Sequence, residues 1–278
     1  MTALERAAQA VVARWIEDES LARSIEREIT EELVAAHRAS LCAVIDDDSG
    51  AAIAVIEGTR AWLLGAAGAS SERVRIERLA EECRALGATR LWSGGPPRWY
   101  LRSGVSVGSQ DELAFRSLGG QEKSRHLDLW VTTRGVQPPE PTVATAVERV
   151  CDDDAFGELA RWVRADFSEA WADEARAAFG RGGLFVARSD REIAAFAAHS
   201  GHCAAAGTFG PLGARASARG RGWGAAVAKS ALRDLAERGF ERACVPWVDE
   251  AVAAFYERIA PEFSLRPRVL YSVDLTAR

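Results

Sequence analysis

One short stretch limits what this chain can fold into more than any other. It is Ala218-Arg-Gly-Arg-Gly-Trp-Gly-Ala225, which lies between a predicted strand and a predicted helix. Its alternating glycines allow a tight turn and let another molecule approach the backbone without meeting a Cβ atom. The amides that begin the helix point outward, and the helix dipole adds roughly half a positive charge there. With the side chains of Arg219 and Arg221, the loop predicts a pyrophosphate site.

Several phosphate-binding patterns are candidates for this loop. A P-loop requires GxxxxGK[ST], but Lys229-Ser230 follows Ala228 and lies inside the predicted helix. A dinucleotide-binding fingerprint requires GxGxxG after the first strand of a parallel unit, whereas this loop follows a predicted antiparallel hairpin. A basic turn at a helix start is the simplest alternative. The pattern [Q/R]-x-x-G-x-[G/A] is matched by Arg219, Gly222 and Gly224.

A proline-rich stretch, Thr133–Pro141, divides the 278 residues into two nearly equal halves. Proline fixes φ and removes a hydrogen-bond donor, so the stretch is typical of an extended linker. We therefore expect a first domain over 1–134, a linker over 135–142 and a second domain over 143–278.

Helical and strand periodicities alternate in the second half, which predicts an α+β fold with a mixed sheet. The expected elements are a strand at 143–151, helices at 153–165 and 168–179, a hairpin of 183–188 and 193–199, a strand at 203–214, a helix from 223 to about 238, a strand at 243–247, a helix at 250–259 and a strand at 269–275.

The first half repeats the end of this pattern, which indicates an internal duplication. It has a mostly helical start before Leu41, then a helix at 71–86, a strand at 89–92, a helix at 111–118 and a strand at 126–131. The positions that match the glycine loop, Ala67–Glu72, lack both arginines, and Glu72 would repel phosphate. The first domain is therefore expected to be degenerate. Its segment Gly94–Gly104 is either a surface loop or the lining of a substrate cleft.

The loop pattern and the element order from Ala144 to Leu275 resemble the GNAT superfamily of N-acetyltransferases. The stretch Gly210-Pro-Leu-Gly-Ala214 and Trp247 followed by Phe255-Tyr256 resemble its tandem bacterial members in particular. The resemblance implies a splayed pair of strands with the acyl-pantetheine arm of acetyl-CoA between them. It also implies the residues that contact this cosubstrate. They are Leu212, Gly213 and Ala214 for the arm, and Arg219, Gly220, Arg221, Gly222, Trp223 and Gly224 for the pyrophosphate, with Asp249 capping the helix after the next strand.

The family's tyrosine falls on Tyr256, seven residues after Asp249. A phenol there can donate a proton to the departing thiolate, although Tyr256 could also simply pack against the sheet with Phe255. The general base is left open, because the predicted strand from Cys203 to Phe209 has no carboxylate. The candidates elsewhere are His199, His202, Glu169, Asp173 and Asp249. Two histidines without a third ligand do not predict a metal site.

Composition narrows the expected partners. The formal net charge of −5 disfavours nucleic acid, and five scattered cysteines fit a reducing cytoplasm. No apolar run approaches the ~18 residues of a membrane span. We expect a cytoplasmic monomer or homodimer that transfers an acetyl group from acetyl-CoA directly to a primary amine of a small molecule, without a metal. The alternatives are a non-catalytic acyl-CoA-binding regulatory module and an acetyltransferase for protein lysines or N-termini.

Overall fold

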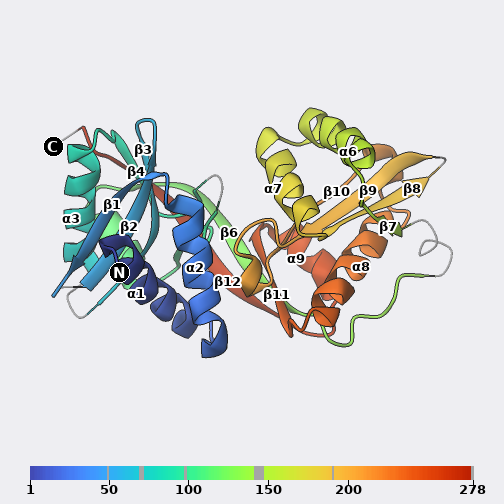
Figure 1. The fold of residues 1–278 in the computed structure, drawn as a ribbon, viewed down its shortest axis with the longest axis horizontal. Helices are drawn as coiled ribbons and strands as arrows, with labels where there is room; N and C mark the ends of the chain where they lie inside the picture. The colour runs from blue at the N-terminus through green and yellow to red at the C-terminus, as the bar shows by residue number, and fades with distance from the viewer. Residues whose placement is uncertain (49, 69–71, 97–98, 141–146, 190, 277–278) are drawn as a thin grey trace. The chain divides into compact units, whose positions relative to one another are not determined.

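The computed structural model describes residues 1–48, 50–68, 72–96, 99–140, 147–189 and 191–276, which form two compact units (Figure 1). Unit 1 comprises Met1–Asp128 and Arg266–Arg278, and unit 2 comprises Leu129–Leu265. These units differ from the predicted domains 1–134 and 143–278, because the end of the chain belongs to unit 1. Two long strands, β6 (Gln121–Thr132) and β12 (Phe263–Asp274), each cross the boundary between the units.

Unit 1 begins with two helices and an antiparallel three-stranded meander. Its elements are α1 (Ala3–Asp18), α2 (Glu26–His37), β1 (Leu41–Asp47), β2 (Gly50–Glu57), β3 (Arg60–Ala67), α3 (Glu72–Ala85), β4 (Arg90–Trp92), β5 (Val105–Ser106) and α4 (Gln110–Ser117), with a 3₁₀ turn at Arg23–Ile25. β4 lies parallel to β3 and antiparallel to β12, which also pairs with β5.

Both faces of the unit 1 sheet are covered by helices, which explains why β2 is buried along most of its length. Helix α1 contacts β2 and β3, and α3 contacts β1 and β2. The side chain of Val11 on α1 packs directly on Gly65 of β3, where a Cβ atom would lie only 2.3 Å from Val11 Cγ1. Beyond the meander, Arg268 of β12 is buried between Glu19 and Asp128, so this strand is part of the core of unit 1.

After an additional first strand, unit 2 repeats this order of elements apart from β5. They are β7 (Val147–Arg149), α6 (Asp153–Asp166), α7 (Glu169–Gly180), β8 (Leu184–Ser189), β9 (Glu192–His199), β10 (Phe209–Ala214), α8 (Trp223–Glu237), β11 (Arg242–Val248) and α9 (Glu250–Glu257). Strands β10, β9, β8 and β7 form an antiparallel sheet in that order, while β11 pairs with β6 in the other sheet. Part of the strand predicted at 143–151 lies outside the described residues.

Helices cover the two faces of the unit 2 sheet, with α6 and α7 on one side and α8 on the other (Figure 1). Alternation along β9 explains this arrangement. Phe196 packs into the cluster formed with α6 and α7, whereas His199, of opposite parity, reaches Asp234 on α8. The predicted mixed α+β fold is therefore confirmed, with its strands and helices in the expected order.

The strand predicted at 203–214 begins only at Phe209. Cys203 and Gly207 have left-handed backbone conformations, with φ of 41° and 66°, and Ala204–Ala206 form a 3₁₀ turn between them. A left-handed residue cannot continue a β-ladder, so residues 203–208 form a compact connection instead. This connection places the start of β10 beside β11.

Candidate active site

Strands β10 and β11 begin together and then separate. A single bridge joins Thr208 to Cys244, and the Cys244 amide donates a hydrogen bond to Gly207 O at 3.1 Å. Beyond this bridge the two strands belong to different sheets. β10 therefore has one edge paired with β9 and one edge open toward β11, which is the splayed arrangement that the resemblance implied.

The alternation of the backbone decides which groups of β10 face the open edge. The Arg215 amide donates to Ala194 O of β9 at 2.9 Å, so Gly213, two residues earlier, also directs its backbone groups toward β9. The backbone groups of Leu212 and Ala214 consequently face the open edge. Gly213 has a packing role as well, because a Cβ atom there would lie 2.6 Å from the rings of both Phe167 and Phe196.

The glycine loop leads from β10 into α8. Gly220 and Gly222 have φ of 75° and 84°, and no atom lies within 4 Å of the Cβ position at either residue or at Gly224. Gly222 begins α8 without a side-chain cap, and the first turn of α8 contains no acidic residue. The amides of this turn are therefore available to an external anion.

Both arginines of the loop are exposed, and neither side chain makes an ion pair or hydrogen bond with a residue that the structure describes. Arg221 and the half-buried Trp223 line a pocket of about 240 Å³ beside the loop, together with Arg215 and the start of β9. The loop thus combines open backbone amides with two uncommitted positive charges, which suits a phosphate group.

Tyr256 is 1% exposed and lies beside the point where β10 and β11 separate. Its ring contacts Phe209, the first residue of β10, with centroids 5.9 Å apart and a perpendicular orientation. Phe255 is also in edge contact with it. Burial raises the pKa of the Tyr256 phenol, so the hydroxyl carries its proton at neutral pH.

Asp249 occupies the capping position that the sequence predicted. Its carboxylate accepts a hydrogen bond from the Val252 amide at 2.8 Å and thereby fixes the start of α9. Since α9 carries Tyr256, this cap helps to position the phenol. A carboxylate engaged in this way is a poor candidate for a general base.

The candidate bases are not brought together. His199 is fully buried, its Nε2 lies 2.8 Å from Asp234, and burial lowers its pKa to about 4 although Asp234 opposes the shift. Glu169 is paired with Arg164 at 2.8 Å, and Asp173 is exposed. No group of three or more histidine, cysteine or acidic residues among the described residues could hold a metal ion.

Sequence reasoning missed Glu174, the neighbour of Asp173. It lies three residues after Trp171, whose ring stacks on Phe167 and contacts Phe196 of the sheet, so helical spacing turns Glu174 toward the sheet as well. The side chain is half-buried and has no hydrogen bond or ion pair with any described residue. This spacing from Trp171 was the available signal.

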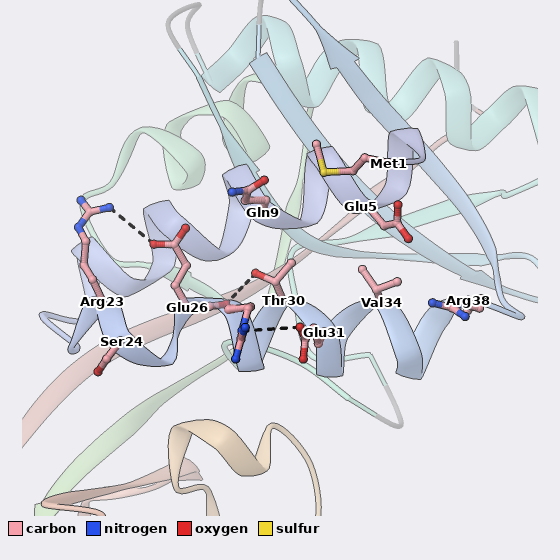
Figure 2. Close-up of a pocket in the computed structure, with 11 residues that line it drawn as sticks. Met1, Glu5, Gln9, Arg23, Ser24, Glu26, Thr30, Glu31, Val34 and Arg38 are labelled. Carbon is pink, nitrogen blue, oxygen red and sulfur yellow. Dashed lines mark hydrogen bonds and ion pairs between the residues drawn. The ribbon is translucent and has the colours of Figure 1, made fainter.

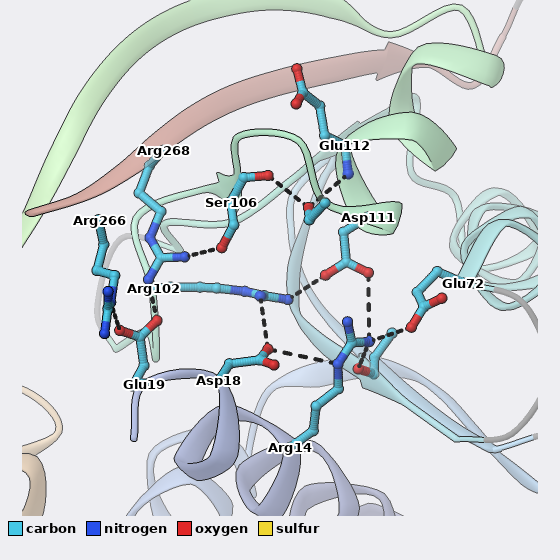
Figure 3. A network of polar contacts seen from close by, with 12 residues as sticks. Arg14, Asp18, Glu19, Glu72, Arg102, Ser106, Asp111, Glu112, Arg266 and Arg268 are labelled. Atoms are coloured by element: carbon cyan, nitrogen blue, oxygen red, sulfur yellow. Dashed lines mark hydrogen bonds and ion pairs between the residues drawn. The ribbon is translucent and has the colours of Figure 1, made fainter. Parts of the chain in front are cut away.

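Unit 1 has the corresponding open edge, but its own side chains occupy it. β3 pairs with β4 only over Arg60–Trp62, and from there to Ala67 it is paired with β2 alone. Arg14 donates to Ala66 O at 2.8 Å and pairs at 2.8 Å with Glu72, the first residue of α3 (Figure 3). The carboxylate of Glu72 therefore lies at the start of α3. The corresponding helix of unit 2, α8, has no carboxylate in its first turn and no side-chain cap.

The segment Gly94–Gly104 contributes to this closure, although residues 97–98 lie outside the described part. Leu101 is buried, and Arg102 pairs with the buried Asp111 at 2.7 Å, close to Arg14 (Figure 3). The pocket lined by Arg14, Leu101 and Arg102 has a volume of only about 10 Å³. The surface-loop interpretation of this segment was wrong, because its large apolar side chains fill the interior of unit 1.

A larger pocket, of about 580 Å³, lies between α1 and α2 (Figure 2). Acidic and basic side chains both line it, and some pair with each other, as Arg23 does with Glu26 at 3.7 Å. It has no glycine loop, and although α2 begins there without a side-chain cap, the first turn of that helix carries Glu26 and Glu28, so the pocket offers no comparable anion site.

Comparisons with known proteins agree with this geometry. The sequence model of the acetyltransferase (GNAT) family matches residues 154–260. No curated protein matched the sequence. Among solved structures, a GCN5-related N-acetyltransferase from Sphaerobacter thermophilus is similar, with 14% identity, a TM-score of 0.61, and coverage of 98% of this chain and 92% of that one.

Two further structures show the same fold. A tandem GNAT protein from the clavulanic acid biosynthesis pathway is 13% identical, with a TM-score of 0.58 and 88% of each chain covered. A glucosamine N-acetyltransferase region in a fungal multi-domain GH3 β-N-acetylglucosaminidase is 19% identical, with a TM-score of 0.63 over 81% of this chain. The match spans only 31% of that fungal chain. Within the described residues, no helix is both long and apolar enough to cross a membrane.

Proposed function

Residues 154–260 match the GNAT acetyltransferase family, and from this premise we propose that the chain is an acyltransferase that moves an acetyl group from acetyl-CoA directly to a primary amine of a small molecule. The observation that carries the proposal is the open edge of β10, which leads into an uncapped glycine loop with two unpaired arginines. A strand edge suits an amide-rich pantetheine arm, and the loop suits a pyrophosphate.

Within this proposal, acetyl-CoA lies along unit 2. Arg219, Gly220, Arg221, Gly222, Trp223 and Gly224 hold the pyrophosphate. The backbone groups of Leu212 and Ala214 bind the pantetheine arm, because they face the open edge, while Gly213 permits the close packing beneath it. The thioester then lies near the start of β10, where Phe209 and Tyr256 meet.

Transfer begins when the amine nitrogen attacks the thioester carbonyl carbon. As the C–N bond forms and the C–S bond breaks, negative charge moves first to the carbonyl oxygen and then to sulfur. We assign stabilisation of the oxygen to a backbone amide near Leu212 and stabilisation of the sulfur to the Tyr256 hydroxyl. Because burial keeps this phenol protonated, it can donate a hydrogen bond to the thiolate.

The test is turnover of acetyl-CoA with a panel of primary amines, including glucosamine, spermidine, tyramine and lysine methyl ester, and with lysine-containing peptides. We expect release of free CoA and formation of an amide with at least one small amine. Tight binding of acetyl-CoA without turnover of any acceptor would instead support the regulatory module. Turnover with peptides alone would support protein acetylation.

A further inference from the structure

Transfer to an amine requires a group that the proposed site does not yet contain. A primary amine with a pKa of about 10 is an ammonium ion at neutral pH and cannot attack until it loses a proton. β10 contributes no carboxylate, and Asp249 and His199 are engaged as a helix cap and in a buried hydrogen bond. The base must therefore come from another element near the thioester.

The arrangement of helices indicates the side from which an acceptor approaches. The glycine loop runs into α8, so the pyrophosphate of a bound acetyl-CoA lies toward the α8 face of the sheet. A nucleophile approaches a planar thioester from one side of its plane, and it needs the side that the cosubstrate leaves free. The opposite face of the β8–β9–β10 sheet is covered by α6 and α7 (Figure 1), and α7 contacts both β9 and β10.

Glu174 lies on α7, at the end of this face where the chain passes from β9 to β10. A Cβ atom at Gly201 would be 2.7 Å from the Glu174 carbonyl oxygen, so α7 contacts the β9–β10 connection at this residue. The same connection leads into Phe209, whose ring contacts Tyr256. Glu174 and Tyr256 therefore lie beside the two ends of one short connection, and the pairing of Phe209 with His199 brings these two ends together.

The surroundings of Glu174 leave its carboxylate uncommitted. Among the described residues it has no hydrogen-bond or ion-pair partner, and burial raises its pKa from 4.5 to about 7. The charged or titratable groups on elements packed against it include Arg181, which donates to Ser200 O at 2.6 Å, and the buried His202 of the connection. A carboxyl group that titrates near neutral pH is matched to general-base catalysis.

We propose that Glu174 is the general base of the reaction, taking one proton from the acceptor ammonium on the α7 face of the sheet. The inference rests on the proposed acetyltransferase function. The neutral amine then attacks the acetyl carbon, and the C–S bond breaks as the C–N bond forms. The nitrogen then loses a second proton, and the thiolate takes up a proton to become the free thiol of CoA. Glu174 returns its own proton to solvent.

The decisive variant is Glu174→Gln, which keeps the shape of the side chain and removes its basicity. At pH 7 we expect kcat/KM for the best amine of the panel to fall by ~10²-fold or more, with acetyl-CoA affinity unchanged in calorimetry. The wild-type rate should level off above about pH 7. The variant should continue to gain about tenfold per pH unit up to the pKa of the amine, because only the unprotonated amine remains reactive.

Asp173→Asn is the matched control, because it removes a carboxylate from the adjacent, exposed position of the same helix. It should preserve both the rate and the pH profile. A substrate-independent readout is the melting temperature. Between pH 4.5 and 7 the folded protein binds more protons at Glu174 than the unfolded chain does, so this residue lowers stability as pH rises through that window. Glu174→Gln should therefore stabilise the protein more at pH 8 than at pH 5.

The outcomes separate this inference from the function on which it rests. If the wild type transfers acetyl groups and Glu174→Gln keeps a rate within twofold and the same plateau above pH 7, Glu174 is not the base. A variant that is slow at all pH values without the expected rise would also overturn the role, because lost packing would explain it. If the wild type turns over no acceptor, the proposed function fails first, and the melting data still report the titration of Glu174.

Discussion

The hydroxyl of Tyr256 lies in a buried environment that determines how it can assist the departing thiolate. Since burial raises its pKa above that of a free thiol, about 8.5, it is suited to hydrogen bonding and less to complete proton transfer. We therefore expect Tyr256→Phe to reduce the single-turnover rate by ~10-fold to 10²-fold, while acetyl-CoA affinity changes little, because only a transition-state interaction is lost.

The same variant separates catalysis from packing at this position. Phenylalanine retains the edge contact with Phe209, so the fold should be preserved. A rate within twofold of the wild type, with the chemical step shown to be limiting, would remove Tyr256 from the mechanism. Positioning by the glycine loop and β10 would then be the main source of catalysis.

His199 makes stability depend on pH. Its Nε2–H donates to Asp234, and burial holds its folded pKa near 4, below the ordinary 6.5. Between these values the unfolded chain binds the proton and the folded protein does not, so stability falls as pH drops from 6.5 toward 4. The loss should be on the order of 3 kcal/mol in denaturant unfolding. His199→Gln should flatten this slope, and an unchanged slope would contradict the assignment.

At single positions, the sequence predicted a helix cap correctly but not the environment of a side chain. Asp249 could be placed as a helix cap because its spacing from the predicted helix was visible. Glu174 was overlooked in favour of Asp173, since choosing between adjacent acidic residues requires the rotation of α7 about its axis. That rotation depends on how Trp171 packs against Phe167 and Phe196, which is tertiary information.

Helix α8 offers a direct test of the anion site, because glycines with positive φ flank both of its ends. Gly222→Glu adds a side chain and a negative charge at the uncapped start, where we expect it to abolish CoA binding in calorimetry. Gly239→Glu introduces the same strain and charge at the opposite end, where nothing lies within 4 Å. This control should bind CoA normally. Unchanged affinity in a folded Gly222→Glu variant would refute the loop assignment.

Elements with a strong local pattern were predicted within a few residues, as for α6, α7 and α8. The failures have long-range causes. Cys203 has no sequence signal for its left-handed conformation, so the start of β10 was placed too early. Nor could periodicity show that β12 pairs with β4, since a strand carries the same alternation whichever partner it has.

For the whole molecule we expect one CoA per chain. Unit 1 fills its own open edge with Arg14 and places Glu72 at the start of α3, so the two features that would receive a cosubstrate are already occupied. Calorimetric titration of the full chain should give a stoichiometry of one, and Gly222→Glu should reduce it to zero. A stoichiometry of two, or residual binding in that variant, would show that unit 1 also has a working site.

The strand β12 has a consequence for how the protein is made. A ribosome translates Met1–Asp128 long before Arg266. Until β12 is made, the edge of β4 that pairs with it is unpaired, and Glu19 and Asp128 lack the buried Arg268. Unpaired edges and buried lone carboxylates both oppose compaction. Unit 2, by contrast, is one continuous segment, and β6, the strand with which its β11 pairs, is synthesised before the rest of the unit. The later half of the chain should therefore fold first, and proteolysis of stalled nascent chains should show protection spreading from residues 129–265 to the N-terminal half.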